Sequence, residues 1–211
     1  MLFGLFHWLI KLTGWLAWAL IVRWRIDYED RSVQGRRIKG AAIVVPNHTT
    51  VMDVGAMLFL FPFRTLRCVV AELMYEKNFF MSFMLHAMGT VKVDRNTHDF
   101  DFIGKCKRIL DRGGVVEIYP ESRLPRVGEE TPLEFKPSAV YLALESGAPI
   151  IPVYTSGEYF GGGRNRIVIG KPIDVRALYD ETLGEQENIA AITAHVRGKI
   201  IELRDRFCKD T

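Results

Sequence analysis

Residues 41–53 read AAIVVPNHTTVMD, an apolar run followed by a proline and then by a group of polar side chains. Short apolar runs that contain β-branched residues are typical of buried strands. Pro46 favours extended backbone at the end of the strand, and Thr49 or Thr50 can cap a helix that begins near Asp53. The stretch therefore predicts a strand, a turn and a helix, with polar groups at the junction.

His48 and Asp53 are the two side chains of this junction that could carry out chemistry. On a continuous helix their separation of five residues would place them about 140° apart, so they can meet only if His48 lies in the turn and Asp53 in the first helical turn. An aspartate that accepts one imidazole N–H leaves the other ring nitrogen free as a general base. Thr50 and Asp53 also have the spacing of a capping box, which would only stabilise the helix start. The pattern leaves both roles open, and they are compatible.

Beyond about residue 40, short β-rich runs alternate with helical patterns. This alternation predicts an α/β domain with a mostly parallel, mixed sheet flanked by helices, over residues 25–211. Strands are expected at 41–45, 65–71, 90–93, 114–119, 149–154 and 166–170, and helices near 53–61, 75–88, 99–112, 136–146 and 185–207.

Polar clusters follow three of these predicted strands. PNHTTVMD follows the strand at 41–45, DRN follows the strand at 90–93, and PESR follows the strand at 114–119. Functional residues in open α/β sheets gather at the carboxyl ends of strands, so the three clusters predict one shared site. Each cluster also has a plainer interpretation, as a helix cap, a surface Arg paired with Asp94, or a polar turn.

The first 22 residues, MLFGLFHWLIKLTGWLAWALIV, are apolar apart from His7, Lys11 and Thr13. As a helix about 33 Å long they could cross a bilayer core, and we expect residues 1–24 to associate with a membrane. Tryptophan and lysine prefer the headgroup level, so the helix could instead lie in the interface. A helix buried in the core of the protein is the third interpretation. One helical stripe carries Trp8, Lys11, Trp15 and Trp18.

Basic residues follow this apolar segment and favour the cytoplasmic side and contact with anionic lipid. They are Arg23, Arg25, Arg31, Arg36, Arg37 and Lys39. Acidic residues are interleaved with them, so an ordinary charged surface loop is the alternative.

Composition and spacing argue against several other classes of function. The net charge of +3 is too small and too scattered to indicate a nucleic-acid partner. The three cysteines form no CxxC pair, and no set of His, Cys and carboxylates has the spacing of metal ligands, so neither a disulfide framework nor a metal is expected. The chain has no GxSxG elbow, and the glycines at 161–163 lack the Lys-Ser/Thr of a P-loop.

Four blocks of the chain, taken in order over about residues 40–155, resemble the PlsC-like glycerolipid acyltransferases, the lysophosphatidate acyltransferases. Residues 47–53 (NHTTVMD) resemble the family's Asn-His-x-Ser-x-x-Asp, with Thr50 in place of serine. Residues 89–95 (GTVKVDR) resemble its glycine, strand and arginine, and residues 148–153 (APIIPV) its apolar run around a proline.

The third block, residues 119–123 (YPESR), resembles an aromatic residue followed by Pro-Glu-Gly-Thr-Arg. Here Ser122 stands at the family's glycine, and the threonine is missing or the arginine is displaced. Arg123 is our choice for the equivalent arginine, and Arg126 is the alternative.

The resemblance implies an acyl transfer in which His48, oriented by Asp53, removes the proton of an acceptor hydroxyl. The alkoxide would attack an acyl thioester on coenzyme A or acyl carrier protein, a co-substrate, so that no cofactor is needed. The helix start after Thr49 would help to stabilise negative charge. Arg95 and Arg123, oriented by Glu121, would bind the phosphate of lysophosphatidate. Further substrate contacts are expected from Asn47, Lys92 and Ser122.

Several points stay open on the sequence. The acceptor could be another lysophospholipid, a lyso-aminolipid or a glycolipid, and a membrane lipid-binding module without turnover is the non-enzymatic alternative. The apolar stretches at 54–63 and 79–89 could line an acyl-chain groove or belong to the core. We expect the protein at the cytoplasmic face of a membrane, with membrane lipids as partners.

Overall fold

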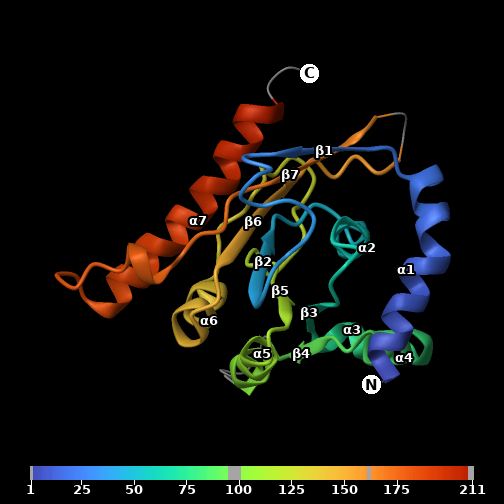
Figure 1. Cartoon of the computed structure of the whole chain (residues 1–211), viewed down its shortest axis with the longest axis horizontal. Coiled ribbons are helices and arrows are strands. Elements are labelled where there is room, and N and C mark those ends of the chain that lie inside the picture. The colour runs from blue at the N-terminus through green and yellow to red at the C-terminus, as the bar shows by residue number, and fades with distance from the viewer. Residues whose placement is uncertain (1, 95–100, 161–162, 209–211) are drawn as a thin grey trace.

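The structure of the protein is a computed structural model that describes residues 2–94, 101–160 and 163–208. In this part of the chain seven strands form one sheet in the order β1-β7-β6-β2-β5-β3-β4 (Figure 1). Only β6 and β7 pair antiparallel; the other neighbours in this described sheet are parallel, which confirms the predicted mixed and mostly parallel sheet. The strands are β1 (Trp24–Tyr28), β2 (Ala42–Pro46), β3 (Leu66–Ala71), β4 (Val91–Val93), β5 (Val115–Glu117), β6 (Ile150–Thr155) and β7 (Asn165–Ile169).

Helices cover both faces of the sheet (Figure 1). Alternation along the strands explains the two cores: Ile43 and Val45 of β2 face α5, α6 and α7, whereas Ala42 and Val44 face α2. The helices are α1 (Leu2–Ile21), α2 (Met52–Leu60), α3 (Glu72–Glu76), α4 (Phe79–Met88), α5 (Asp101–Asp111), α6 (Ser138–Ser146) and α7 (Glu185–Cys208), with a 3-10 turn η1 (Arg176–Leu178) before α7.

Two elements differ from the sequence prediction. β1 was not expected, because its sequence WRIDY is largely polar; it forms because β7 offers a parallel edge, with Trp24 opposite Asn165. The single helix expected near 75–88 is two helices, α3 and α4. Asn78 begins the second one, since its side chain accepts a hydrogen bond from the Met81 N–H at 2.7 Å.

The apolar N-terminal segment forms the helix α1, which packs against α2 and α4 along one side of the domain (Figure 1). No helix in the described part of the chain has the length and the apolar character needed to cross a membrane. The predicted stripe is wrong for two of its members. Lys11 turns into the protein and donates to the carbonyls of Phe61, Pro62 and Arg64, and Trp18 stacks on Phe59 with ring centroids 5.0 Å apart.

Candidate active site

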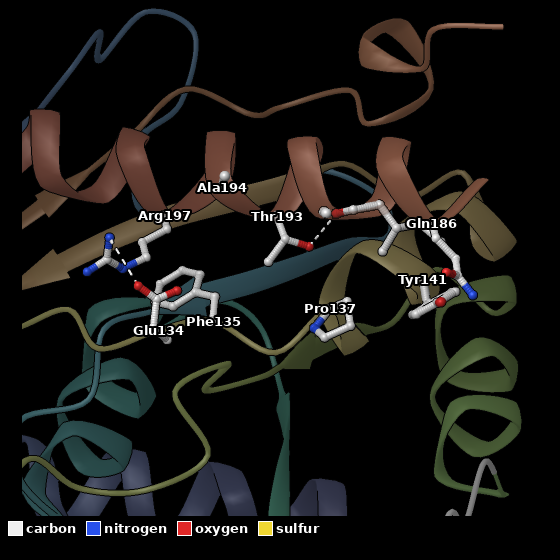
Figure 2. Close-up of a pocket in the computed structure, with 10 residues that line it drawn as sticks. Glu134, Phe135, Pro137, Tyr141, Gln186, Thr193, Ala194 and Arg197 are labelled. Atoms are coloured by element: carbon white, nitrogen blue, oxygen red, sulfur yellow. Dashed lines mark hydrogen bonds and ion pairs between the residues drawn. The ribbon is translucent and has the colours of Figure 1, made fainter. Parts of the chain in front are cut away.

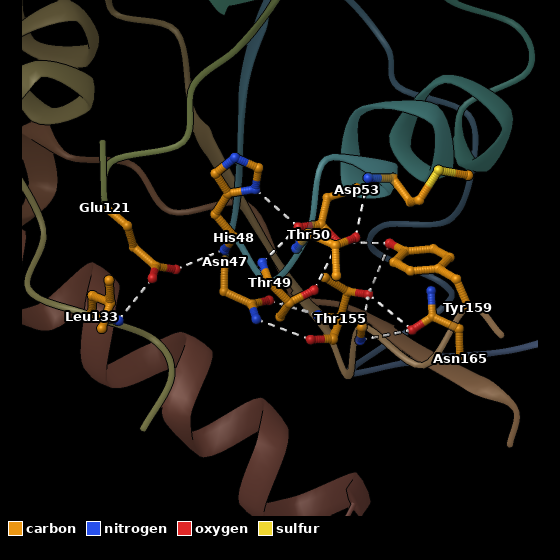
Figure 3. A network of polar contacts seen from close by, with 12 residues as sticks. Asn47, His48, Thr49, Thr50, Asp53, Glu121, Leu133, Thr155, Tyr159 and Asn165 are labelled. Carbon is orange, nitrogen blue, oxygen red and sulfur yellow. Dashed lines mark hydrogen bonds and ion pairs between the residues drawn. The ribbon is translucent and has the colours of Figure 1, made fainter. Parts of the chain in front are cut away.

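The carboxyl end of β2 is locked to the end of β6 by Asn47. This residue is fully buried; its amide nitrogen donates to the Thr155 carbonyl at 2.9 Å and its amide oxygen accepts from the Thr155 N–H at 2.7 Å (Figure 3). Since both ends of the amide are occupied, the structure gives Asn47 a structural role instead of the predicted substrate contact. It fixes the point at which the chain turns toward His48.

His48 and Asp53 meet across the junction between β2 and α2, in the way that their spacing requires. The ring Nδ1 of His48 lies 2.9 Å from Oδ2 of Asp53 (Figure 3). Asp53 is fully buried in the first turn of α2, whereas the His48 side chain keeps 15% of its surface exposed. The other ring nitrogen, Nε2, has no hydrogen-bond partner in the described part of the chain. The arrangement therefore leaves Nε2 available to a substrate.

Four more donors hold the Asp53 carboxylate. Oδ2 accepts the backbone N–H groups of Thr49 and Thr50 at 2.6 and 2.8 Å, and Oδ1 accepts the hydroxyls of Thr49 and Tyr159 at 2.9 and 2.7 Å. Asp53 thus orients the imidazole and accepts the N–H groups of the two residues that precede the helix, but only half of the capping box is present. The Thr50 hydroxyl accepts the Met52 N–H at 3.1 Å, and the Asp53 N–H donates to the Thr50 carbonyl. The expectation that this helix start stabilises an oxyanion is wrong for these two N–H groups, because they already donate to Asp53.

Tyr159 is a site residue that the sequence analysis missed. It lies in the glycine-rich turn between β6 and β7, beside Asn165, whose side-chain oxygen accepts hydrogen bonds from Thr155, Ser156 and Gly157. Gly157 has a φ of +77°, and a Cβ there would lie 2.3 Å from Oγ1 of Thr49. Only glycine lets this turn approach the His48 loop so closely, and that approach brings Tyr159 to Asp53.

Glu121 holds the backbone of the site instead of orienting an arginine as predicted. Its two carboxylate oxygens accept the N–H groups of His48 at 2.7 Å and Leu133 at 2.9 Å (Figure 3). Burial raises the pKa of Glu121, although both backbone hydrogen bonds oppose the shift. The third block therefore meets the first block through a backbone contact, which confirms that these two strand ends share one site.

The exposed arginines that follow Glu121 are held by Glu129. The Arg123 guanidinium forms a bidentate pair with the Glu129 carboxylate, with N–O distances of 2.6 and 3.0 Å, and Glu129 also accepts the Arg126 N–H at 2.7 Å. Ser122, at the family's glycine position, has a φ of +60°. It keeps the left-handed backbone that glycine adopts at little cost, which explains how serine can replace glycine in this block.

The third predicted cluster is described only in part. Lys92 of β4 forms an ion pair with Glu72 of α3, and its ammonium lies over the Tyr75 ring at 6.0 Å from the centroid. Arg95 lies outside the described residues, so its predicted contact with phosphate stays a prediction.

A second buried carboxyl lies on the same face of the sheet as the site. Glu117, the last residue of β5, is 2% exposed, and its burial raises its pKa to about 8. The ring of Tyr119 packs against the His48 ring with centroids 4.3 Å apart. Neither Oε1 of Glu117 nor the Tyr119 hydroxyl has a hydrogen bond of good geometry in the described part of the protein. Sequence patterns gave no sign of Glu117, because a glutamate inside an apolar run reads as an ordinary strand residue.

A pocket of about 400 Å³ lies on the opposite face of the sheet, between α6, α7 and residues 134–137 (Figure 2). It does not contain His48. Arg197 on its rim donates to the carbonyls of Pro132 and Leu133, and so supports the segment that Glu121 holds from the other side. Within the described residues no group of three or more His, Cys, Asp or Glu side chains is arranged to hold a metal ion.

The chain belongs to the acyltransferase family, because the Acyltransferase family model matches residues 25–156, more than half of its length. This confirms the family resemblance of the four sequence blocks. The chain is 22% identical over 171 residues to human 1-acyl-sn-glycerol-3-phosphate acyltransferase beta; the match covers 80% of this chain but spans only 61% of that relative. Its fold is similar to the crystal structure of PlsC, the 1-acyl-sn-glycerophosphate (LPA) acyltransferase of Thermotoga maritima. The TM-score is 0.64 and the identity 21%, over 95% of this chain and 80% of that one.

Proposed function

We propose that the protein transfers a fatty acyl group from a thioester to the free hydroxyl of lysophosphatidate, forming phosphatidate for phospholipid synthesis. The observation that carries this proposal is a His48 ring whose Nδ1 is hydrogen-bonded to Asp53 and whose Nε2 has no hydrogen-bond partner among the residues that the structure describes. The names of the human relative and of the Thermotoga maritima structure support lysophosphatidate as the acceptor.

In the proposed reaction Nε2 of His48 takes the proton of the acceptor hydroxyl, and the alkoxide attacks the thioester carbon. Asp53 stabilises the imidazolium that forms. As the tetrahedral intermediate collapses, the C–S bond breaks, and the imidazolium proton passes to the leaving thiolate. Coenzyme A or acyl carrier protein leaves as the free thiol, so each turnover restores neutral His48 without a cofactor.

The phosphate of the acceptor is proposed to bind Arg123 and Arg95. Arg123 lies two residues from Glu121, which itself contacts the His48 backbone, and this short separation along the chain supports a phosphate site near the base. In the structure Glu129 occupies this guanidinium in the bidentate manner that suits a phosphate. Binding of the acceptor would therefore exchange Glu129 for phosphate.

The N-terminal segment at 1–24 is proposed to associate with the cytoplasmic face of a membrane, where both the acceptor and the product reside. The element order supports the division into this segment and the α/β domain at 25–211, because α1 precedes the first strand; α1 nevertheless packs against α2 and α4.

The test is to supply the purified protein with labelled acyl-CoA or acyl carrier protein thioester and a panel of lysolipids that includes aminolipid and glycolipid acceptors. We expect transfer to lysophosphatidate, and a loss of about 10²- to 10⁴-fold in His48→Ala. His195→Ala, which changes an exposed histidine of α7, is the matched control and should keep the wild-type rate. A wild-type rate in His48→Ala would exclude the mechanism, and transfer only to another lysolipid would change the acceptor.

The phosphate proposal has its own pair of variants. Arg123→Ala should raise the KM for lysophosphatidate, whereas Glu129→Gln should lower it by releasing the guanidinium. An unchanged KM in both would place the phosphate away from Arg123.

A further inference from the structure

A buried carboxyl beside His48 and Asp53 has no part in the proposed reaction. Glu117 ends β5, and its side chain faces α2, because Val115 belongs to the core on that side of the sheet and Val116 to the core on the other side. The residue is 2% exposed, and its Oε1 has no hydrogen bond of good geometry in the described part of the chain. A buried acid with an unsatisfied oxygen costs free energy of folding, which indicates a role other than stability.

Tyr119 connects this carboxyl to the proposed base. It follows Glu117 by two positions on the same face of the chain, since Ile118 between them belongs to the opposite core. The Tyr119 ring lies against the His48 ring with centroids 4.3 Å apart, and its hydroxyl is buried. The hydroxyl is near enough to Glu117 to lower the pKa of the carboxyl, although the geometry falls short of a good hydrogen bond. Tyr119 thus contacts the base with its ring and acts on Glu117 with its hydroxyl.

The groups around Glu117 favour its protonated form. Burial is the main cause that raises its pKa to about 8, and the negative charge of Asp53 adds to the shift. The residue directly opposite on β3 is Cys68, whose thiol stays neutral because burial raises its pKa well above the usual value. The residue opposite on β2 is Val44, which has no charge. Glu117 is therefore mostly a neutral acid at neutral pH.

We propose that Glu117 is a positioning residue for His48 and that it works in its protonated form. As a neutral group it supports the Tyr119 ring against the imidazole without adding a negative charge to those of Asp53 and Glu121, which already contact His48. The inference deepens the proposed function and rests on it, because it concerns the same base.

Ionisation of Glu117 would slow the proposed reaction. The repulsion between Glu117 and Asp53 is mutual, so a charged Glu117 acts on the His48–Asp53 pair as well. A further negative charge stabilises the imidazolium, which then passes its proton less readily to the leaving thiolate. The same charge repels the oxyanion of the tetrahedral intermediate. Turnover should therefore fall as the pH rises through about 8.

The test compares kcat for acyl transfer at two pH values within each variant. Glutamine keeps a neutral polar group of similar size at every pH. In Glu117→Gln the ratio of kcat at about pH 9 to kcat at about pH 7 should therefore be about five- to tenfold higher than in the wild type. Glu145→Gln, which changes an exposed carboxyl of α6, is the matched control and should keep the wild-type ratio. Circular dichroism at both pH values checks that each protein is folded.

Tyr119→Phe is the second variant, because it keeps the ring beside His48 and removes only the hydroxyl. That hydroxyl lowers the pKa of Glu117, so its loss should raise this pKa and move the fall in kcat to a higher pH. Tyr179→Phe, at an exposed position, is its control and should leave the pH profile unchanged. A role of Tyr119 in folding alone would not move the profile, so an unmoved profile contradicts the connection through Tyr119.

A measurement without substrate separates this inference from the proposed function. In NMR the ring protons of His48, assigned with His48→Ala, should show a second, smaller titration near pH 8 that Glu117→Gln abolishes. The inference is overturned if Glu117→Gln has the wild-type ratio of kcat values. Where no lysolipid is acylated, it is overturned if the His48 titration is the same in both proteins. If the titrations differ as expected and no lysolipid is acylated, only the proposed function fails.

Discussion

The two ends of α2 use the same electrostatic principle for different purposes. At the N-terminus the Asp53 carboxylate accepts the N–H groups of Thr49 and Thr50, and at the C-terminus the Lys11 ammonium donates to the carbonyl of Phe61. Each charge complements the nearby end of the helix dipole. Asp53 is also hydrogen-bonded to the His48 ring, whose Nε2 has no partner in the described part of the chain. Within the same residues the Lys11 ammonium donates hydrogen bonds only to backbone carbonyls.

This difference shows what turns a helix cap into a reactive site. A capping charge that is fully used by the backbone stabilises the structure and fastens one helix to another. A charged side chain that also hydrogen-bonds a second side chain, such as the His48 imidazole, positions the remaining polar atom of that side chain for chemistry. The comparison predicts that changes at the N-terminal end reduce turnover, whereas changes at the C-terminal end reduce stability.

The largest effect is expected from Asp53→Asn. The amide no longer fixes the imidazole tautomer or stabilises the imidazolium, so kcat should fall by about 10²- to 10⁴-fold. Turnover with labelled acyl thioester is the measurement, and circular dichroism checks that the variant is folded. Asp111→Asn, at the exposed end of α5, is the control. A kcat within twofold or so of the wild type would remove Asp53 from the proposed mechanism.

Glu117→Gln contrasts Asp53, whose carboxylate accepts five hydrogen bonds, with a buried carboxyl whose Oε1 has no hydrogen bond of good geometry in the described part of the protein. The Glu117 carboxyl has an ordinary pKa of 4.5 when unfolded and a pKa of about 8 in the protein. Between these pH values Glu117 binds a proton in the native state but not in the unfolded state. The stability that this proton contributes is therefore complete below about pH 4.5 and is lost as the pH rises to about 8. Glutamine does not titrate, so the substitution should make the free energy of unfolding less dependent on pH and stabilise the protein by a few kcal/mol at high pH. Chemical denaturation across this pH range measures the free energy of unfolding, and Glu145→Gln is the control. A pH dependence of that free energy equal to that of the wild type would contradict the prediction.

Lys11→Met tests the other end of α2. The substitution keeps roughly the length of the side chain but removes the ammonium donor from the carbonyls of Phe61, Pro62 and Arg64, of which Phe61 still accepts the Arg64 N–H. The free energy of unfolding should therefore fall by about 2 kcal/mol. Thermal and denaturant unfolding measure the loss, and Lys39→Met at an exposed position should change little. Turnover of a dispersed acceptor should stay close to that of the wild type. A large loss of turnover without a loss of stability would mean that the two ends are not separate in function.

Tyr159→Phe should give the smallest effect, because it removes one of five donors to Asp53. We expect kcat to fall by about tenfold. Tyr179→Phe, an exposed position, is the control. A kcat equal to that of the wild type would show that the Tyr159 hydroxyl does not contribute to the reaction.

Local sequence was enough to predict the strand, turn and helix at 41–53 and to show that His48 and Asp53 could meet only across that junction; their pairing was implied by the family resemblance. These features depend on periodicity and on backbone geometry within a few residues. The alternation of strand and helix patterns predicted the fold class, and the placement of polar clusters after strands predicted that the first and third strand ends lie together. Tyr159 was not predictable in the same way, because it lies 106 residues from Asp53 and reaches it only through the packing of a turn. The role of Glu121 was also misjudged, since a carboxylate next to arginines gives no sign that it binds backbone N–H groups.

The sequence by itself determined that α1 is an apolar helix with a single lysine and that His48 and Asp53 can cooperate only across a loop–helix junction. Composition and the rise and turn of a helix suffice for both conclusions. Only the tertiary structure decided which way the helix faces. The carbonyls that receive Lys11 and the α4 side chain Phe83 that packs against Phe6 lie on segments about fifty to eighty residues away in the chain. Burying one ammonium against three carbonyls costs little once those partners are in place, and no local pattern in the sequence records that they are.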